Sequence, residues 1–202
     1  MPNSRLTRRS FGGALAGTMA LAILPRAAAA LDDASARALI DRAVGEVHEI
    51  INSGRSEARM LTDFEGIFTR YADVTTIART TLGAAARQAT AAQMSAYTRA
   101  FGIYLSHKYG RRFREFIGAR IEITGSRPLK SFYEVRSVAY LQGEAPFELL
   151  WYVSSASGRD LFFNIVIEGV DLLNSERIEM GAMLDRRRGD LDAMIADLRA
   201  RG

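Results

Sequence analysis

Residues able to perform catalysis are sparse in this sequence. It has two histidines, His48 and His107, and no cysteine, which excludes a thiolate nucleophile, a disulfide and a thiolate metal site. Each histidine falls within a predicted helix among charged residues, where a solvent-exposed position is the simplest interpretation. The acidic residues lack a metal-ligand spacing, and the pair Gly12–Gly13 belongs to an N-terminal leader rather than a phosphate loop. The sequence therefore predicts no catalytic residue, metal site or cofactor.

Two clusters of cations are the remaining polar candidates. Lys108, Arg111, Arg112 and Arg114 stand where a predicted helix ends, and Arg186–Arg188 end another. The helix dipole stabilises cations at a helix C-terminus, which is one explanation of both clusters. The other is functional: the guanidinium groups of Arg111, Arg112 and Arg114 form a rim that binds an anionic headgroup or docks an acidic partner.

The N-terminus has the three zones of an export signal. Arg8–Arg9 precede a 14-residue uncharged stretch, Phe11–Leu24, which is followed by the small-residue run Ala27–Ala30. A spanning helix needs about 20 apolar residues, so we expect residues 1–30 to be a cleavable leader, cut near Ala30. The paired arginines resemble a twin-arginine signal, and the general secretory route is the alternative. Export from a bacterial cytoplasm places the remaining domain, residues 31–202, in the periplasm.

Removing the leader balances the charge. The chain has 27 basic and 23 acidic residues; the leader holds four of the arginines and no acidic residue, which leaves 23 of each. A nucleic-acid-binding surface needs an excess of positive charge in the folded domain. We therefore expect no nucleic-acid partner. The remaining chain has no second apolar segment of membrane-spanning length. We also expect the protein to be a monomer.

Apolar periodicity changes once along the remaining chain. Residues spaced by three and four predict helices over about 32–51, 60–71, 74–82 and 90–110, with Thr90 and Gln93 as a capping box. After Gly118 the period becomes two, which predicts four antiparallel strands, or five, and two helices follow from Leu172 and Leu191. This pattern predicts an α+β fold: an antiparallel sheet with helices packed on one face.

Large apolar side chains gather on the core-facing positions of these elements. On the last long strand, strict alternation predicts that Leu161, Phe163, Ile165 and Ile167 share the apolar face. An ordinary packed core explains most of these large apolar side chains, and a ligand cavity is the alternative.

Several motifs resemble the MlaC family, also called the toluene-tolerance Ttg2 family. They are Ile77–Gly83, Arg87–Thr90 with Gln93, Phe101 with Leu105, Ile167–Asn174 with Arg177, and Gly189–Leu191. The chain departs from the family pattern at Ala86, where a tryptophan is common, and at Leu161–Phe162, where a Trp-Lys pair is usual. It also has Asp171 in place of a serine and Glu176 in place of a tyrosine.

The resemblance implies a periplasmic carrier that holds phospholipid tails in an apolar cavity between sheet and helices. It also implies two partners: an inner-membrane ABC transporter complex with a substrate-binding ring protein, and an outer-membrane lipoprotein/porin complex. A related branch of the family is associated with hopanoid lipids, which is an alternative cargo. The residues expected to contact lipid are Phe64, Phe68, Tyr71, Phe101, Tyr104, Leu105, Leu149, Trp151, Phe163 and Ile165.

Two interpretations of another class remain. The first is a small-molecule enzyme with a hydrophobic pocket that uses His107 or a buried aspartate. The second is an interaction or scaffold protein, whose core would be filled. Pocket volume distinguishes the second from a carrier, and replacement of both histidines tests the first.

Overall fold

The computed structural model describes residues 31–202, apart from the side chains of Phe113 and Arg114. The expected export signal lies outside the described residues. The N-terminal half is helical: α1 (Asp33–Ile51), α2 (Glu57–Tyr71), α3 (Val74–Leu82), the 3-10 helix η1 (Gly83–Arg87), α4 (Ala91–Gly110) and the 3-10 helix η2 (Arg111–Phe116). The strands follow, β1 (Arg120–Leu129), β2 (Phe132–Tyr140), β3 (Phe147–Ser154), β4 (Leu161–Ile167) and β5 (Val170–Asp171), and then the helices α5 (Leu172–Arg186) and α6 (Leu191–Arg201). The predicted α+β fold is confirmed.

Local signals set the ends of the helices. The Thr90 side chain accepts a hydrogen bond from the backbone N–H of Gln93 at 3.1 Å, and the Gln93 side chain accepts one from the N–H of Thr90 at 3.1 Å. This confirms the predicted capping box at the start of α4. The C-cap of α3 is Gly83, whose φ of +63° is one that side-chain-bearing residues rarely adopt. The chain turns there without strain, and α3 ends at the predicted residue.

The strands form an antiparallel meander in the order β1-β2-β3-β4-β5. The register pairs Val135 with Trp151 and Trp151 with Ile165, so these three side chains share one face of the sheet. We call it the inner face, because α1 packs against β1 and β2, and α2, α3 and α5 contact β4. The opposite face is called the outer face.

The predicted alternation along β4 is wrong in its first half. Tyr152 pairs with Asn164 but Val153 pairs with Phe162, so Phe163 is an extra residue in a β-bulge. A bulge moves every residue before it to the other face. Phe162 therefore lies on the inner face, and Leu161 and Phe163 do not share that face with Ile165.

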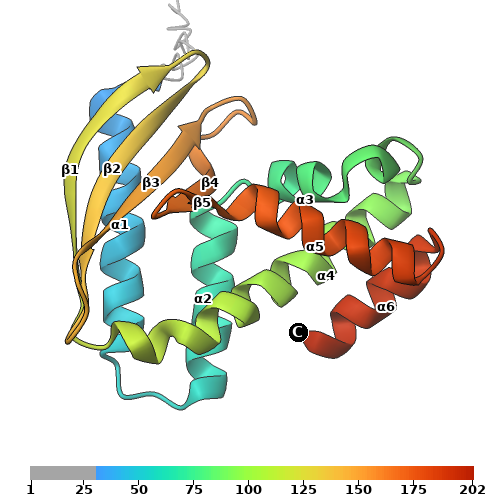
Figure 1. Ribbon diagram of the computed structural model, residues 1–202, viewed down its shortest axis with the longest axis horizontal. Helices are drawn as coiled ribbons and strands as arrows, with labels where there is room; N and C mark the ends of the chain where they lie inside the picture. Colours follow the sequence, from blue (N-terminus) through green and yellow to red (C-terminus); the bar gives the residue numbers. More distant parts are fainter. Residues whose placement is uncertain (1–30) are drawn as a thin grey trace, which may run out of the picture.

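The helices fall into two groups (Figure 1). α1 and α2 run beside the sheet, whereas α3, α5 and α6 lie at the other end of the molecule, and the long helix α4 reaches from one group to the other. Contacts of α4 with both α2 and α6 hold the groups together. None of the helices in residues 31–202 combines the length and the hydropathy of a membrane-spanning segment.

Candidate functional site

The ten apolar residues expected to contact lipid come from four elements. α2 supplies Phe64, Phe68 and Tyr71, α4 supplies Phe101, Tyr104 and Leu105, β3 supplies Leu149 and Trp151, and β4 supplies Phe163 and Ile165. Those on α2 and α4, with Trp151, Phe163 and Ile165, belong to one hydrophobic cluster or pack against it, and Leu149 is also buried. We call the region between the inner face and the helices the helix–sheet interface. Apart from Phe163, the predicted residues meet around it and pack against one another.

Phe162 links α2 to the inner face and was not among the predicted residues. Its ring lies edge-on to Trp151, with centroids 5.6 Å apart, and edge-on to Phe68 at 6.3 Å. The backbone N–H of Asp73 donates to the carbonyl of Phe162 at 2.8 Å, which holds the start of α3 against β4. The bulge at Phe163 is what turns this ring inward, and simple alternation conceals it.

Phe163 is the predicted residue that the fold separates from the others. It lies on the outer face with Phe132 and Tyr152, at centroid distances of 5.3 and 6.1 Å. The outer face also carries Glu134, a buried carboxylate bonded to the Arg127 guanidinium at 2.7 Å. The hydrogen bond from Arg127 keeps the pKa of Glu134 below its ordinary value.

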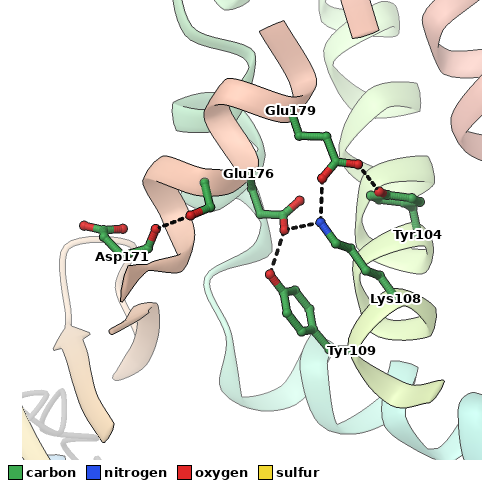
Figure 2. Close-up of polar contacts among 7 residues, drawn as sticks. Tyr104, Lys108, Tyr109, Asp171, Glu176 and Glu179 are labelled. Carbon is green, nitrogen blue, oxygen red and sulfur yellow. Dashed lines mark hydrogen bonds and ion pairs between the residues drawn. The ribbon is translucent and has the colours of Figure 1, made fainter. Parts of the chain in front are cut away.

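A cluster of charged and phenolic groups joins α4 to α5 (Figure 2). Lys108 Nζ donates to Glu176 Oε1 and to Glu179 Oε2, both at 2.6 Å, and the Tyr109 hydroxyl donates to Glu176 Oε1 at 2.7 Å. The Glu176 side chain is 3% exposed, and no hydrogen-bond partner reaches its Oε2 atom among the described residues. Tyr104, one of the predicted lipid contacts, donates its hydroxyl to Glu179 at 2.5 Å.

These contacts shift the protonation equilibria of the cluster. Burial, with the Glu179 hydrogen bond, raises the pKa of Tyr104 to about 12, and burial with the Glu176 bond raises that of Tyr109 as well. Burial disfavours the charged form of Lys108, but the two glutamates outweigh it and raise the lysine pKa. Lys108 is therefore a structural cation between α4 and α5.

The histidines are not the solvated helix residues that the sequence predicts. His107 is 17% exposed, and its Nε2 atom lies 2.7 Å from Glu65 Oε1. The Nε2 atom of His48 is buried, with no hydrogen-bond partner among the described residues. Both helices are packed on more than one side, so positions outside the main apolar stripe are also covered. The buried aspartate Asp73 caps α3 by accepting from the N–H of Thr76 at 2.9 Å.

The three predicted docking arginines differ in their surroundings. Arg111 is the C-cap of α4 and lines a pocket of about 20 Å³ whose walls include Met60, Leu61 and Phe64. Arg112 is paired with Glu115 at 3.3 Å, and the side chain of Arg114 lies outside the described residues. A cation beside apolar side chains can pair with an anionic group.

A second and much larger pocket lies on the helical side. It is a groove of about 1290 Å³ between α2, α3, η1 and α4, and four arginines line it: Arg79, Arg87, Arg99 and Arg177. We call it the arginine groove. Of the ten predicted lipid contacts, it is lined by Phe68 alone.

Comparison with known proteins identifies the family. The sequence model of the MlaC protein matches residues 41–200. The chain belongs to the MlaC family. Among solved structures, this MlaC chain is similar to a phospholipid-binding protein from Ralstonia solanacearum, determined in complex with a phospholipid. The two share 20% sequence identity with a TM-score of 0.69, over 81% of this chain and 98% of that chain, which shows a common fold.

Three of the five motifs that carry the MlaC resemblance contribute residues to the arginine groove. Arg79, Thr80 and Gly83 come from the first motif, Arg87 from the second, and Arg177 from the fourth. A Cβ atom built on Gly83 would lie 3.7 Å from the Nε atom of Arg177. The Arg177 guanidinium therefore lies directly against the end of α3. The motifs are far apart in sequence, and the packing of α5 on α3 brings them together.

Sequence reasoning missed the polar cluster of this MlaC chain, although a signal was present. Glu176 follows Leu173 by three residues and precedes Met180 by four, so it occupies the apolar stripe of α5. Lys108 continues the stripe of Tyr104 and Leu105 on α4 in the same way. A charged residue in a buried stripe requires a partner of opposite charge.

Proposed function

We propose that this chain is a periplasmic phospholipid carrier that holds acyl tails in the helix–sheet interface. The observation that carries the proposal is the fold, which the chain shares with a protein determined in complex with a phospholipid. Membership of the MlaC family supports it. The carrier would move lipid between an outer-membrane lipoprotein/porin complex and an inner-membrane ABC transporter complex with a substrate-binding ring protein, and no chemical step is required.

The hydrophobic effect explains why such a carrier is needed. About 30 tail methylenes at ~0.8 kcal/mol each oppose free passage through water by roughly 25 kcal/mol. The large apolar side chains around Trp151, Ile165 and Phe101 can replace that water. Because these side chains interlock, uptake requires the sheet and the helices to move apart, so that contacts among side chains are exchanged for contacts with hydrocarbon.

The small pocket beside Arg111 is the proposed entrance. It lies where α1, α2 and α4 end or begin, and its walls reach the buried residues Ile51 and Phe64 of the core. Tails would enter between these helices, and the phosphate would remain outside near Arg111. The expected export signal agrees with this location, since a carrier between two membranes must leave the cytoplasm.

Lipid analysis of the exported protein tests the proposal. The full chain is produced in a bacterium, released from the periplasm, and examined by N-terminal sequencing, native mass spectrometry and lipid extraction. We expect a mature N-terminus near residue 31 and co-purified phospholipid; extraction of hopanoid instead would change the cargo. Protein that carries no lipid, and takes up none from vesicles with labelled phospholipid, would refute the proposal.

Two neighbouring residues of β2 provide a matched pair of variants. Ala139 is fully buried on the inner face, where it pairs with Ile121 and Phe147, whereas Val138 points to the outer face. Ala139→Phe should fill the interface and reduce the bound lipid several-fold, and Val138→Phe should leave it unchanged. Thermal melts identify variants that fail to fold, and Ala139→Leu provides a smaller filling step. Equal lipid content in all three would contradict the assignment to the inner face.

A further inference from the structure

The arginine groove carries an unbalanced positive charge. Its four arginines are exposed and come from four elements: Arg79 from α3, Arg87 from η1, Arg99 from α4 and Arg177 from α5. Within the described chain, none of the four has an ion-pair or side-chain hydrogen-bond partner. The groove has one acidic lining residue, Glu65, whose carboxylate is already bonded to His107.

Several arginines elsewhere in the described chain are paired with acidic neighbours. Arg70 pairs with Glu46 at 2.9 Å and Arg187 with Asp197, and Arg127 pairs with Glu134. Four unpaired guanidinium groups around one hollow repel one another, and this repulsion lowers the stability of the compact state. Several negative charges bound in the groove would remove that repulsion.

The other residues that line the groove limit the shape of the negatively charged ligand that can fit it. The side chains between the arginines are small, as at Ala84 and Gly102, apolar, as at Val74 and Met94, or hydroxyl-bearing, as at Thr98. A flat bilayer surface cannot reach the floor of a concave groove, and a single phosphate engages only one or two guanidinium groups. A turn of helix occupies about 500 Å³, taken from its diameter and pitch. A groove of about 1290 Å³ therefore accepts two to three turns of a helix with acidic and apolar faces.

We propose that the arginine groove is the docking surface for an acidic, amphipathic helical segment of a partner protein. The carboxylates of the segment bind Arg79, Arg87, Arg99 and Arg177, and its apolar face rests on the floor. The inference adds a partner surface to the proposed carrier. It does not depend on the cargo, because the charges and the shape of the arginine groove are independent of what the helix–sheet interface holds.

A binding assay with defined probes tests the inference. Purified full-chain protein is titrated with a labelled 14-residue helical peptide that has glutamate on one face and leucine on the other, and with its lysine counterpart. We expect salt-dependent binding of the glutamate peptide and none of the lysine peptide. The double variant Arg87→Glu/Arg99→Glu should weaken binding about tenfold or more. Ala86→Trp, which fills the groove without changing its charge, should also weaken it.

Two exposed arginines of α5 provide the matched control. Arg177 lines the groove and Arg186 does not, so Arg177→Glu should weaken binding whereas Arg186→Glu should leave it within twofold of the wild type. Failure of the wild type to bind the glutamate peptide at low salt would overturn the proposal. So would an equal loss for Arg186→Glu, or binding only to phosphatidylglycerol vesicles. Lipid content, measured in parallel, should stay at the wild-type level in every arginine variant, so failure here is distinguishable from failure of the carrier proposal.

Discussion

Replacement of Lys108 by methionine should destabilise the protein by leaving a charge buried without its partner. Lys108 Nζ is the cation bonded to Glu176, whose side chain is 3% exposed. Without it, the Tyr109 hydroxyl is the remaining donor to that carboxylate. Breaking a buried ion pair by removing one partner costs about 3–5 kcal/mol.

The lower end of that range applies here. Lys108 is itself 32% exposed, so water can enter the gap and solvate Glu176 in part. We expect a loss of about 3 kcal/mol at pH 7, a large fraction of the 5–15 kcal/mol that is usual for a whole domain. For a domain of this size, the midpoint of thermal unfolding should fall by roughly 6–12 °C.

Urea denaturation followed by circular dichroism measures the loss, and two further variants show its cause. Glu179→Gln removes the more exposed partner, whose side chain is 37% exposed, and should cost about 1 kcal/mol or less. The double variant Lys108→Met/Glu176→Met replaces the pair with apolar side chains and should recover most of the stability. If the double variant is as unstable as Lys108→Met alone, or if Glu179→Gln costs as much as Lys108→Met, the loss does not come from a stranded charge.

Three other substitutions have defined outcomes. Arg127→Met should lower the unfolding temperature at pH 7, and by less at pH 3. The lowered pKa of Glu134 contributes stability that is present above the ordinary pKa of a glutamate and is lost as the pH falls through the lowered pKa. An equal effect at both pH values would contradict this explanation. Phe162→Ala should cost about 3–5 kcal/mol and shift the fluorescence of the single tryptophan to longer wavelength, since the ring edge-on to it is lost; unchanged emission would argue against that contact. Asp73→Ala removes the cap of α3 and should cost about 1–2 kcal/mol in urea denaturation, whereas Asp73→Asn should cost less.

Local signals in the sequence determined most of the secondary structure. The capping box of Thr90 and Gln93, the stop at Gly83 and the change of period after Gly118 each act through residues within about four positions of one another, so they can be identified without knowledge of the fold. The family motifs likewise predicted the architecture. The same reasoning failed at Phe163, because a bulge depends on how β4 pairs with β3 and has no signature in the alternation itself.

The tertiary structure alone decided which distant residues meet. Glu176 in an apolar stripe indicates a buried carboxylate, but only the packing of α5 on α4 supplies Lys108 as its cation. The arginine groove is a similar case: Arg99 and Arg177 are ordinary exposed residues in the sequence, and they line one hollow because α3, α4 and α5 converge there. Caps and periodicity are short-range effects encoded by neighbours in the chain. Charge clusters and cavities arise from contacts between segments far apart in sequence, which exist only after the chain has folded.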